Sequence, residues 1–147
     1  MVQSSSAGFE AGDFALITIN DIPVSIEELY KNKVEKCNYR GLHIVVINPS
    51  TGKVESANIF DTYKSSFGLD AFIGKGVPDG YIVCAACKDE CTMKLSHNCK
   101  KWFASMGSRE IFNVRYRQSF AFIGVSNRKE EVHEKRGKLV THKAAVA

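Results

Sequence analysis

One segment of the chain is apolar at nearly every position and carries no charge. It is Gly80–Cys87, and it follows the turn sequence Val77-Pro78-Asp79-Gly80. An uncharged run bounded by a turn is typical of a strand buried on both faces, and such a strand lies in the middle of a sheet. Lys88-Asp89-Glu90 comes directly after it. The pattern therefore predicts charged side chains held at the end of a central strand.

Other apolar segments predict further strands. The clearest unit is a β-hairpin, because residues 42–47 and 53–60 flank five residues of turn-forming types. Residues 14–19 and 119–125 combine β-branched, aromatic and other apolar side chains, as strands do. Residues 138–143 are one more candidate strand.

Residues 22–26 fit two different structures. Their alternating apolar side chains predict a short strand, which Pro23 would confine to the edge of a sheet. Ser25 and Glu28 instead match a capping box at the start of a helix. The sequence leaves both interpretations open.

Two segments have the spacing of short helices. Ser66 is the expected N-cap of the first helix and Ser96 that of the second. The side chains expected to face inward from the first helix are Phe67, Leu69, Phe72 and Ile73. Those of the second helix recur at i, i+3, i+4 and i+7 and are Cys99, Trp102, Phe103 and Met106. Gly107 is expected to end the second helix.

The length of 147 residues predicts one domain. The Ser-, Gly- and Ala-rich residues 1–11 predict a flexible leader, and residues 12–147 predict the domain, with a basic tail over residues 128–147. No run of about 18 apolar residues is present, so we expect no membrane insertion. The first residues lack the layout of a secretory signal peptide. The net charge is only +4 and glutamates interrupt the basic tail, so no nucleic-acid partner is expected.

Five cysteines leave at least one thiol unpaired within the chain. They are Cys37, Cys84, Cys87, Cys91 and Cys99. A zinc site is disfavoured, because Cys84 and Cys87 lie along an apolar strand, whereas zinc sites usually combine two short cysteine-containing turns. A disulfide between Cys91 and Cys99 is expected if the protein meets an oxidising compartment.

The sequence contains no recognisable catalytic motif. It has no G-x-S-x-G motif, P-loop or dinucleotide fingerprint, and none of its four histidines lies in a zinc-protease motif. We therefore expect no enzymatic activity, no cofactor and no metal. Arg40, Asp89 and Arg117 remain as polar side chains at predicted strand ends. Two guanidinium groups and a carboxylate suit hydroxyl and amide ligands, and the alternative is a structural ion pair of Asp89 with an arginine.

Several motifs also resemble, in order and in spacing, those of the interleukin-like EMT inducer family, whose domain is also called PANDER-like. They are Arg40–Gly52, Phe60–Tyr63, Val77–Val83, Lys88–Glu90, Met106–Ser108 and Tyr116–Gly124. The resemblance extends over residues 13–126. It implies an α+β fold, a compact β-sandwich-like domain with short flanking helices.

In its site residues the sequence is most similar to one family member, the carbohydrate-binding stem domain of protein O-mannose N-acetylglucosaminyltransferase. That resemblance implies that Arg40, Asp89 and Arg117 hold a sugar. Glu90 is expected to assist them, and Phe120 or Tyr116 is expected to offer an apolar face. The sequence departs from the family at Cys91, Gln118 and Phe120, where the family usually has glycine, aspartate and tryptophan.

The function expected from these observations is that of a lectin, a carbohydrate-binding protein without catalysis. Its partners would be glycans or glycoconjugates, and a homodimer would supply the multivalency that a weak sugar site needs. The expected location is extracellular or secreted, with leaderless cytoplasmic storage as another possibility. The alternative function is that of a secreted cytokine-like ligand that acts through a protein receptor.

Overall fold

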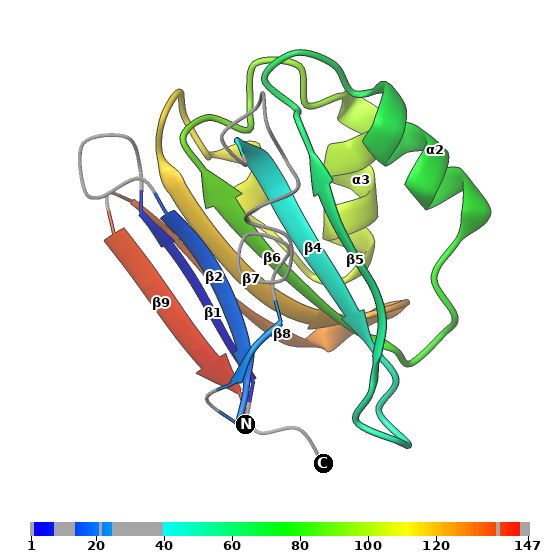
Figure 1. Ribbon diagram of the computed structural model, residues 1–147. Coiled ribbons are helices and arrows are strands. Elements are labelled where there is room, and N and C mark those ends of the chain that lie inside the picture. The colour runs from blue at the N-terminus through cyan, green and yellow to red at the C-terminus, as the bar shows by residue number, and fades with distance from the viewer. Residues whose placement is uncertain (1, 8–13, 21, 25–39, 138, 145–147) are drawn as a thin grey trace.

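The computed structural model describes residues 2–7, 14–20, 22–24, 40–137 and 139–144. Within them the chain forms two antiparallel sheets, ordered β3-β2-β1-β9 and β5-β4-β6-β7-β8 (Figure 1). The strands are β1 (Val2–Ala7), β2 (Phe14–Ile19), β3 (Ile22–Pro23), β4 (Gly41–Ile47), β5 (Val54–Phe60), β6 (Ile82–Lys88), β7 (Ser119–Val125), β8 (Arg128–Gly137) and β9 (Leu139–Ala144). The helices are α2 (Phe67–Lys75), α3 (His97–Ser105) and the short 3-10 helix η2 (Glu110–Phe112).

The five-stranded sheet is the middle of three layers. Alternate residues of β4 point to opposite faces, as the geometry of a strand requires. Ile44 packs in the core shared with the helices, whereas Val45 packs in the core shared with the four-stranded sheet. The side chains of β6 alternate between the same two cores, so this strand is buried on both faces. Its predicted central position is thus confirmed.

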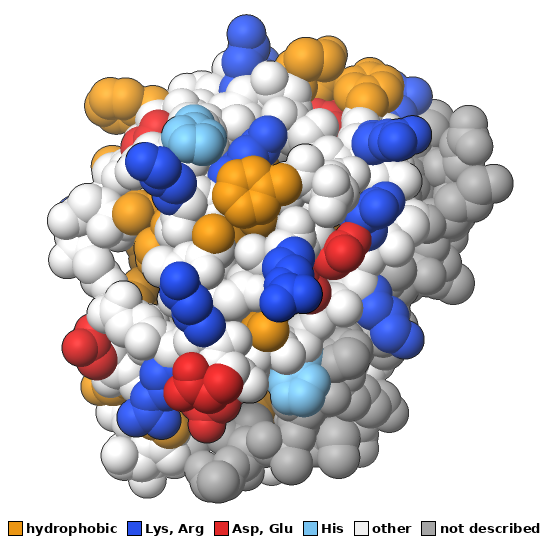
Figure 2. Space-filling model, turned by 180° about the vertical axis from the view of Figure 1, so that it is seen from behind, with side chains coloured by type: hydrophobic (Ala, Val, Ile, Leu, Met, Phe, Trp, Pro, Cys, Tyr) orange, Lys and Arg blue, Asp and Glu red, His pale blue; other side chains and the backbone are white. Residues whose placement is uncertain are grey.

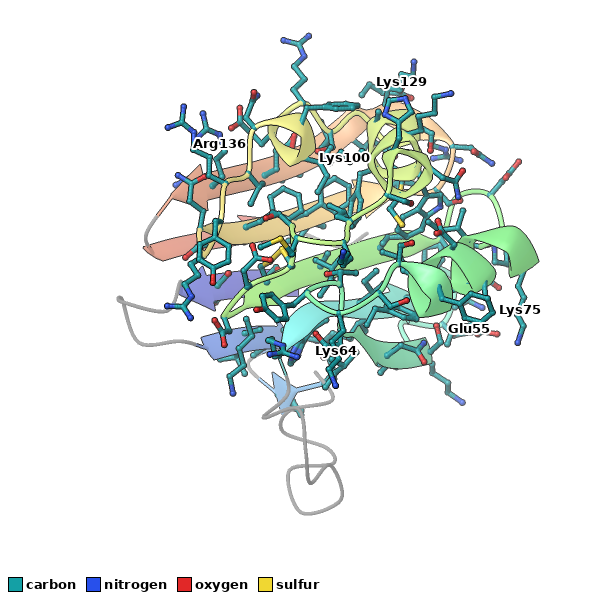
Figure 3. All side chains as sticks on the ribbon, turned by 90° about the horizontal axis from the view of Figure 1, so that it is seen from above. Glu55, Lys64, Lys75, Lys100, Lys129 and Arg136 are labelled. Atoms are coloured by element: carbon teal, nitrogen blue, oxygen red, sulfur yellow. A yellow bond between two sulfur atoms is a disulfide. The ribbon has the colours of Figure 1, made fainter. Side chains whose placement is uncertain are left out.

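Charged side chains of both signs lie on the surface (Figure 2), whereas aromatic rings fill much of the space between the helices and the middle sheet (Figure 3). Phe103 of α3 is fully buried, and its ring centroid lies 5.8 Å from that of Phe120 and 5.1 Å from that of Phe122. Trp102 and Phe72 extend this group toward α2. Edge-to-face aromatic contacts of this kind add to the burial energy of the rings.

The family resemblance implied a β-sandwich-like domain with flanking helices, and the two packed sheets with two short helices agree with it. The predicted hairpin is β4–β5, and Ser96 caps α3 by accepting a hydrogen bond from the Cys99 N–H. Ser66 is the N-cap residue of α2, but its side chain makes no capping hydrogen bond. Phe67 is 81% exposed, so the prediction that it faces inward is wrong.

The prediction of a flexible leader over residues 1–11 is wrong for residues 2–7, which form β1 between β2 and β9. The serines of this segment suit burial because their hydroxyl groups are hydrogen-bonded. Ser4 Oγ donates to the Ala85 carbonyl at 2.5 Å, and Ser6 Oγ donates to the Cys87 carbonyl. Residues 8–11 lie outside the described residues.

Residues 22–23 form the short edge strand β3, so the strand interpretation holds there, and the alternative helix from Ser25 lies outside the described residues. The predicted basic tail is part of the domain. Its first half is β8, which the sequence interpretation missed, and its second half contains β9, close to the predicted strand.

Candidate functional site

The predicted site residues meet at one end of the five-stranded sheet. Neighbouring strands are antiparallel, so β4 and β7 begin at the end of the sheet where β5 and β6 finish. The register pairs Gly41 with Lys88 and Leu42 with Phe60. We call the side chains gathered there the strand-end cluster, which consists of Arg40, Asp61, Tyr63, Asp89, Tyr116 and Arg117.

Arg40 forms a two-pronged ion pair with Asp61. Its Nε donates to Asp61 Oδ1 at 3.0 Å and its Nη2 donates to Oδ2 at 2.7 Å. Its guanidinium carbon also lies 4.3 Å from the centroid of the Tyr63 ring. The hydrogen bond with Asp61 raises the pKa of Arg40, and the negative charge of Asp89 contributes to the same increase. Arg40 is therefore held in place on one side of the cluster.

Sequence reasoning missed Asp61. The available signal was its place in the family-like motif Phe60–Tyr63, one residue beyond the end of β5. Gly41 allows Asp61 to approach Arg40, because Gly41 has φ 115° and a Cβ at this position would collide with the Phe60 carbonyl oxygen. Gly41 is thus needed for its backbone conformation, and Arg40 for its charge.

Asp89 and Arg117 form the other side of the cluster. Arg117 Nε lies 3.8 Å from Asp89 Oδ1, and the Arg117 guanidinium carbon lies 5.2 Å from the centroid of the Tyr116 ring. Both residues have left-handed backbone conformations, with φ 60° for Asp89 and 58° for Arg117. Such conformations cost about 1–2 kcal/mol for an L-residue and persist where the surroundings fix them.

The three predicted residues thus come together, and each arginine also has a carboxylate partner. Both interpretations from the sequence, a ligand site and structural ion pairs, find support in this geometry. The pair of Asp89 with Arg117 is long and partly exposed, so it contributes little to stability. Its groups therefore remain accessible to a ligand at low energetic cost.

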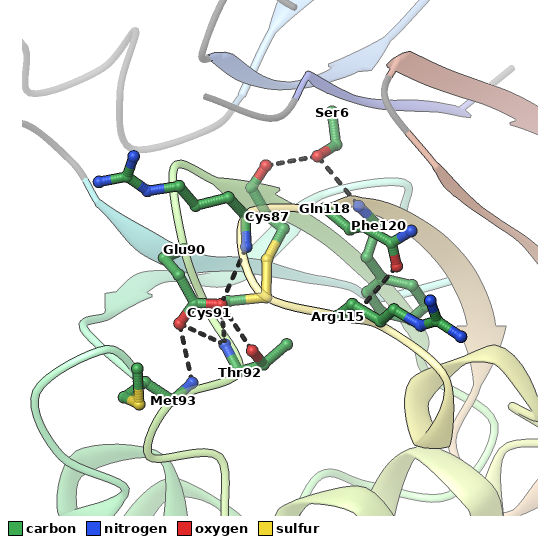
Figure 4. The surroundings of a disulfide bond; sticks show 10 residues. Ser6, Cys87, Glu90, Cys91, Thr92, Met93, Arg115, Gln118 and Phe120 are labelled. Atoms are coloured by element: carbon green, nitrogen blue, oxygen red, sulfur yellow. Dashed lines mark hydrogen bonds between the residues drawn. A yellow bond between two sulfur atoms is a disulfide. The ribbon is translucent and has the colours of Figure 1, made fainter. Parts of the chain in front are cut away.

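Glu90 does not face a ligand, so its prediction as a sugar-binding residue is wrong. Its side chain is buried, and its carboxylate accepts hydrogen bonds from the N–H groups of Thr92 and Met93 at 2.9 and 2.8 Å. It also accepts from Thr92 Oγ1 at 2.6 Å and from the Arg117 N–H at 3.3 Å (Figure 4). Glu90 therefore ties the loop after β6 to the loop before β7.

Phe120 is fully buried against Phe103 and Phe122, so the prediction that it offers an apolar face to a ligand is wrong. The physical reason is its place in β7, where alternate side chains enter the helix-side core. Tyr116, the other predicted aromatic residue, is 51% exposed and lies beside Arg117.

The disulfide joins Cys87 to Cys91, so the predicted pair of Cys91 with Cys99 is wrong. Cys99 is a buried free thiol of α3, whereas Cys87 and Cys91 lie at the two ends of a tight loop with their Cα atoms 5.9 Å apart. That loop carries Asp89 and Glu90, so the disulfide closes the segment that presents one carboxylate of the cluster (Figure 4). Cys84 is also free and buried, and burial raises its pKa. Cys37 lies outside the described residues.

A hollow of about 570 Å³ lies between α3, η2 and β8. It is lined by Ala104, Gly107, Ser108, Arg109, Glu110, Lys129, Val132 and Glu134, none of which belongs to the cluster. The Glu134 carboxylate in its wall already accepts hydrogen bonds from Ser108 Oγ at 2.6 Å and from the Arg109 N–H at 2.9 Å. In the part of the chain that the structure describes, no group of three or more His, Cys, Asp or Glu side chains is placed to hold a metal ion.

These features define a small antiparallel β-sandwich with a polar, aromatic-flanked cluster at one end of its central sheet. Residues 40–128 match the family described as Interleukin-like EMT inducer, and the chain belongs to that family. Every residue of the strand-end cluster lies within the matched segment. The predicted family is thus confirmed.

Relatives of the chain carry two kinds of name. It is 28% identical to mouse Protein FAM3D over 105 residues, which are 71% of this chain and 47% of that protein. It is 33% identical to human Protein FAM3D over 89 residues, 60% of this chain and 39% of that protein. It is 30% identical to human Cell migration-inducing and hyaluronan-binding protein over 89 residues, 59% of this chain and 6% of that protein. The chain thus spans less than half the length of each.

No helix among the described residues is both long and apolar enough to span a membrane.

Proposed function

We propose that this chain is a non-catalytic recognition protein that acts as a cytokine-like ligand and meets a protein receptor through the strand-end cluster. The observation that supports this most directly is the match to the interleukin-like family, which includes the whole cluster. The disulfide of Cys87 with Cys91 supports an extracellular or secreted location, because disulfides persist in oxidising compartments.

The chemistry of the cluster suits a protein partner. Arginine and tyrosine are among the residue types that most often dominate the binding energy of protein interfaces. Tyr116 is half-exposed beside Arg117, and Arg40 is fixed by Asp61 and Tyr63. Groups that are ordered before binding lose less conformational entropy when the partner arrives.

Carbohydrate binding is a second candidate, and the geometry of the cluster favours it. Guanidinium donors of Arg40 and Arg117 lie near the Asp89 carboxylate, which can accept hydrogen bonds from sugar hydroxyls. The exposed ring of Tyr116 offers an apolar face for a sugar ring. One relative is itself named as a hyaluronan-binding protein, although the similarity covers only 6% of that protein.

Binding to cells distinguishes the two candidates. Labelled protein is added to intact cells, to cells whose surface proteins were removed by protease, and to cells treated with glycosidases. A protein receptor predicts loss of binding after protease alone, whereas a glycan ligand predicts loss after glycosidase and a positive signal on a glycan array. Unchanged binding after both treatments would contradict both candidates.

One variant pair tests whether the cluster is the binding surface. Loss of one charge-assisted hydrogen bond costs about 1.5–3 kcal/mol, so Arg117→Ala should lower the affinity roughly tenfold to hundredfold. The matched control is Arg128→Ala, which should bind like the wild type because Arg128 is an exposed residue at the start of β8, opposite the far end of β7. If both variants bind alike, the cluster is not the surface in use.

The expected homodimer also remains a proposal. A single shallow sugar site binds with about millimolar affinity, and two linked sites raise the avidity by about 10²–10⁴. Among the described strands, β5 is at the edge of its sheet, and such an edge can pair across a two-fold contact. Light scattering at tens of micromolar protein should give twice the mass of the chain. A strictly monomeric mass would contradict a dimeric lectin.

A further inference from the structure

Positive charge is concentrated around the strand-end cluster. Among the described residues, the cations in the loops and strand termini at this end of the five-stranded sheet are Arg40, Lys64, Lys88, Lys94, Arg115 and Arg117. The acidic residues in the same loops are Asp61, Asp89 and Glu90. The described residues of these segments therefore carry a net charge of +3, six cations against three carboxylates.

Hydrogen bonds between the loops place these charges on one surface. The Lys94 N–H donates to the Thr62 carbonyl at 2.7 Å, so the loop before α3 lies against the loop after β5. The Arg117 N–H donates to Glu90, and Lys88 pairs with Gly41 in the sheet. The loops that carry the cations thus lie side by side, although they come from four separate segments of the chain.

Arg40 and Arg117 already pair with carboxylates, and the exposed cations beside them are Lys64, Lys94 and Arg115. Glu90 is buried, where its charge is balanced by the N–H and hydroxyl groups that it accepts from. Asp61 is engaged by both prongs of Arg40. Lys94 and Arg115 are exposed, so their charges are available to a binding partner. A surface of this kind attracts anionic ligands and repels cationic ones.

We infer that the ligand of the strand-end cluster is an acidic polysaccharide, a chain of sugars with carboxylate or sulfate groups. The inference rests on the proposal that the cluster binds glycans. The planar guanidinium group of the exposed Arg115 matches carboxylate and sulfate oxygens in pairs, the exposed Lys94 adds a second cation, and Tyr116 can pack on a sugar ring.

A nucleic acid is the other polymer that a basic surface with aromatic side chains can bind. The disulfide of Cys87 with Cys91 closes the loop that carries Asp89 and is typical of proteins of oxidising compartments. Acidic polysaccharides are abundant outside cells, and nucleic acids are not. This observation favours the polysaccharide.

The test measures binding of the full chain to immobilised heparin, hyaluronan, neutral dextran and a single-stranded oligonucleotide over a range of sodium chloride concentrations. We expect at least tenfold tighter binding to one of the acidic polysaccharides than to dextran or the oligonucleotide. Three or so ionic contacts predict about a tenfold loss of affinity between 50 and 200 mM salt. Equal binding to dextran, without dependence on salt, would overturn the inference but keep glycan binding.

Charge-reversal variants locate the surface. Lys94→Glu should reduce binding to the acidic polysaccharide about tenfold or more, whereas Lys53→Glu should leave it nearly unchanged. Both lysines are exposed, but Lys53 lies in the β4–β5 turn, at the opposite end of the sheet. Equal losses in the two variants would refute a local site. Binding of the oligonucleotide as tight as that of heparin would replace the polysaccharide by polyanions in general, and no binding to heparin or hyaluronan would overturn the inference while leaving the glycan array to decide on neutral sugars.

Discussion

The substitution Glu90→Gln tests whether a buried carboxylate holds the two loops of the candidate site together. Glu90 Oε2 accepts from the Met93 N–H at 2.8 Å, while Oε1 accepts from Thr92 Oγ1 and the Arg117 N–H. Glutamine has nearly the same shape but only one acceptor oxygen. One set of donors must therefore face an NH₂ group, and at least one part-buried N–H loses its partner.

An unsatisfied buried donor costs about 1–3 kcal/mol, so we expect Glu90→Gln to lower the free energy of unfolding by about 2 kcal/mol. For a chain of this length that corresponds to a decrease of about 6 °C in Tm. The effect should be local as well. The amide protons of Met93 and Arg117 should exchange faster with solvent, and binding that depends on Arg117 should weaken.

Thermal denaturation and amide hydrogen exchange measure both effects. The matched control is Glu55→Gln, an exposed glutamate of β5 that carries the same change in charge. It should shift the stability by less than about 0.5 kcal/mol. If Glu90→Gln is as stable as Glu55→Gln and keeps its amide protection, Glu90 does not hold the loops together.

Three other predictions follow from the structure. Gly41→Ala should lower the free energy of unfolding by about 2 kcal/mol or more, because Gly41 has φ 115° and a Cβ there would collide with the backbone of residues 60 and 61. Gly74→Ala in α2 should instead raise the free energy of unfolding by about 0.5–1 kcal/mol, because a Cβ there has nothing within 4 Å. Chemical denaturation of the two variants and the wild type measures both changes. Non-reducing peptide mapping should recover a cross-link between Cys87 and Cys91, and any other pairing contradicts the structure. Hydrogen bonds from Asn and Ser side chains keep the pKa of Asp70 below its ordinary value of 3.8, so its contribution to stability is present above that pH and disappears as the pH falls through the lowered pKa. The difference in Tm between the wild type and Asp70→Asn should accordingly shrink as the pH falls below about 4, and a constant difference from pH 6 to pH 3 would be inconsistent with this role.

Some features of this protein are determined by local sequence alone. The uncharged run that became β6 is buried on both faces, and a strand of that composition has only the middle of a sheet to occupy. The hairpin β4–β5 and the capped helix α3 depend on turn and capping residues that act on their immediate neighbours. These elements were predicted nearly to their ends.

Other features were decided only by tertiary contacts. The serines of β1 look like those of a flexible leader, and they are buried only because carbonyl groups of β6 accept their hydroxyl hydrogens. The partner of Cys91 depends on the path of the loop after β6, which brings it back to Cys87. Spacing along the chain contains no information on either contact.

The candidate site shows the same division. Charged residues at strand ends were visible in the sequence, and antiparallel pairing then brought Arg40, Asp89 and Arg117 to the same end of the five-stranded sheet. Their neighbours were not visible, because the pairing of Arg40 with Asp61 and the burial of Glu90 arise from loops that meet only in the folded chain. Local sequence thus determined which residues lie at the strand ends, and the packing of the loops decided which of them face solvent and which hold the site together.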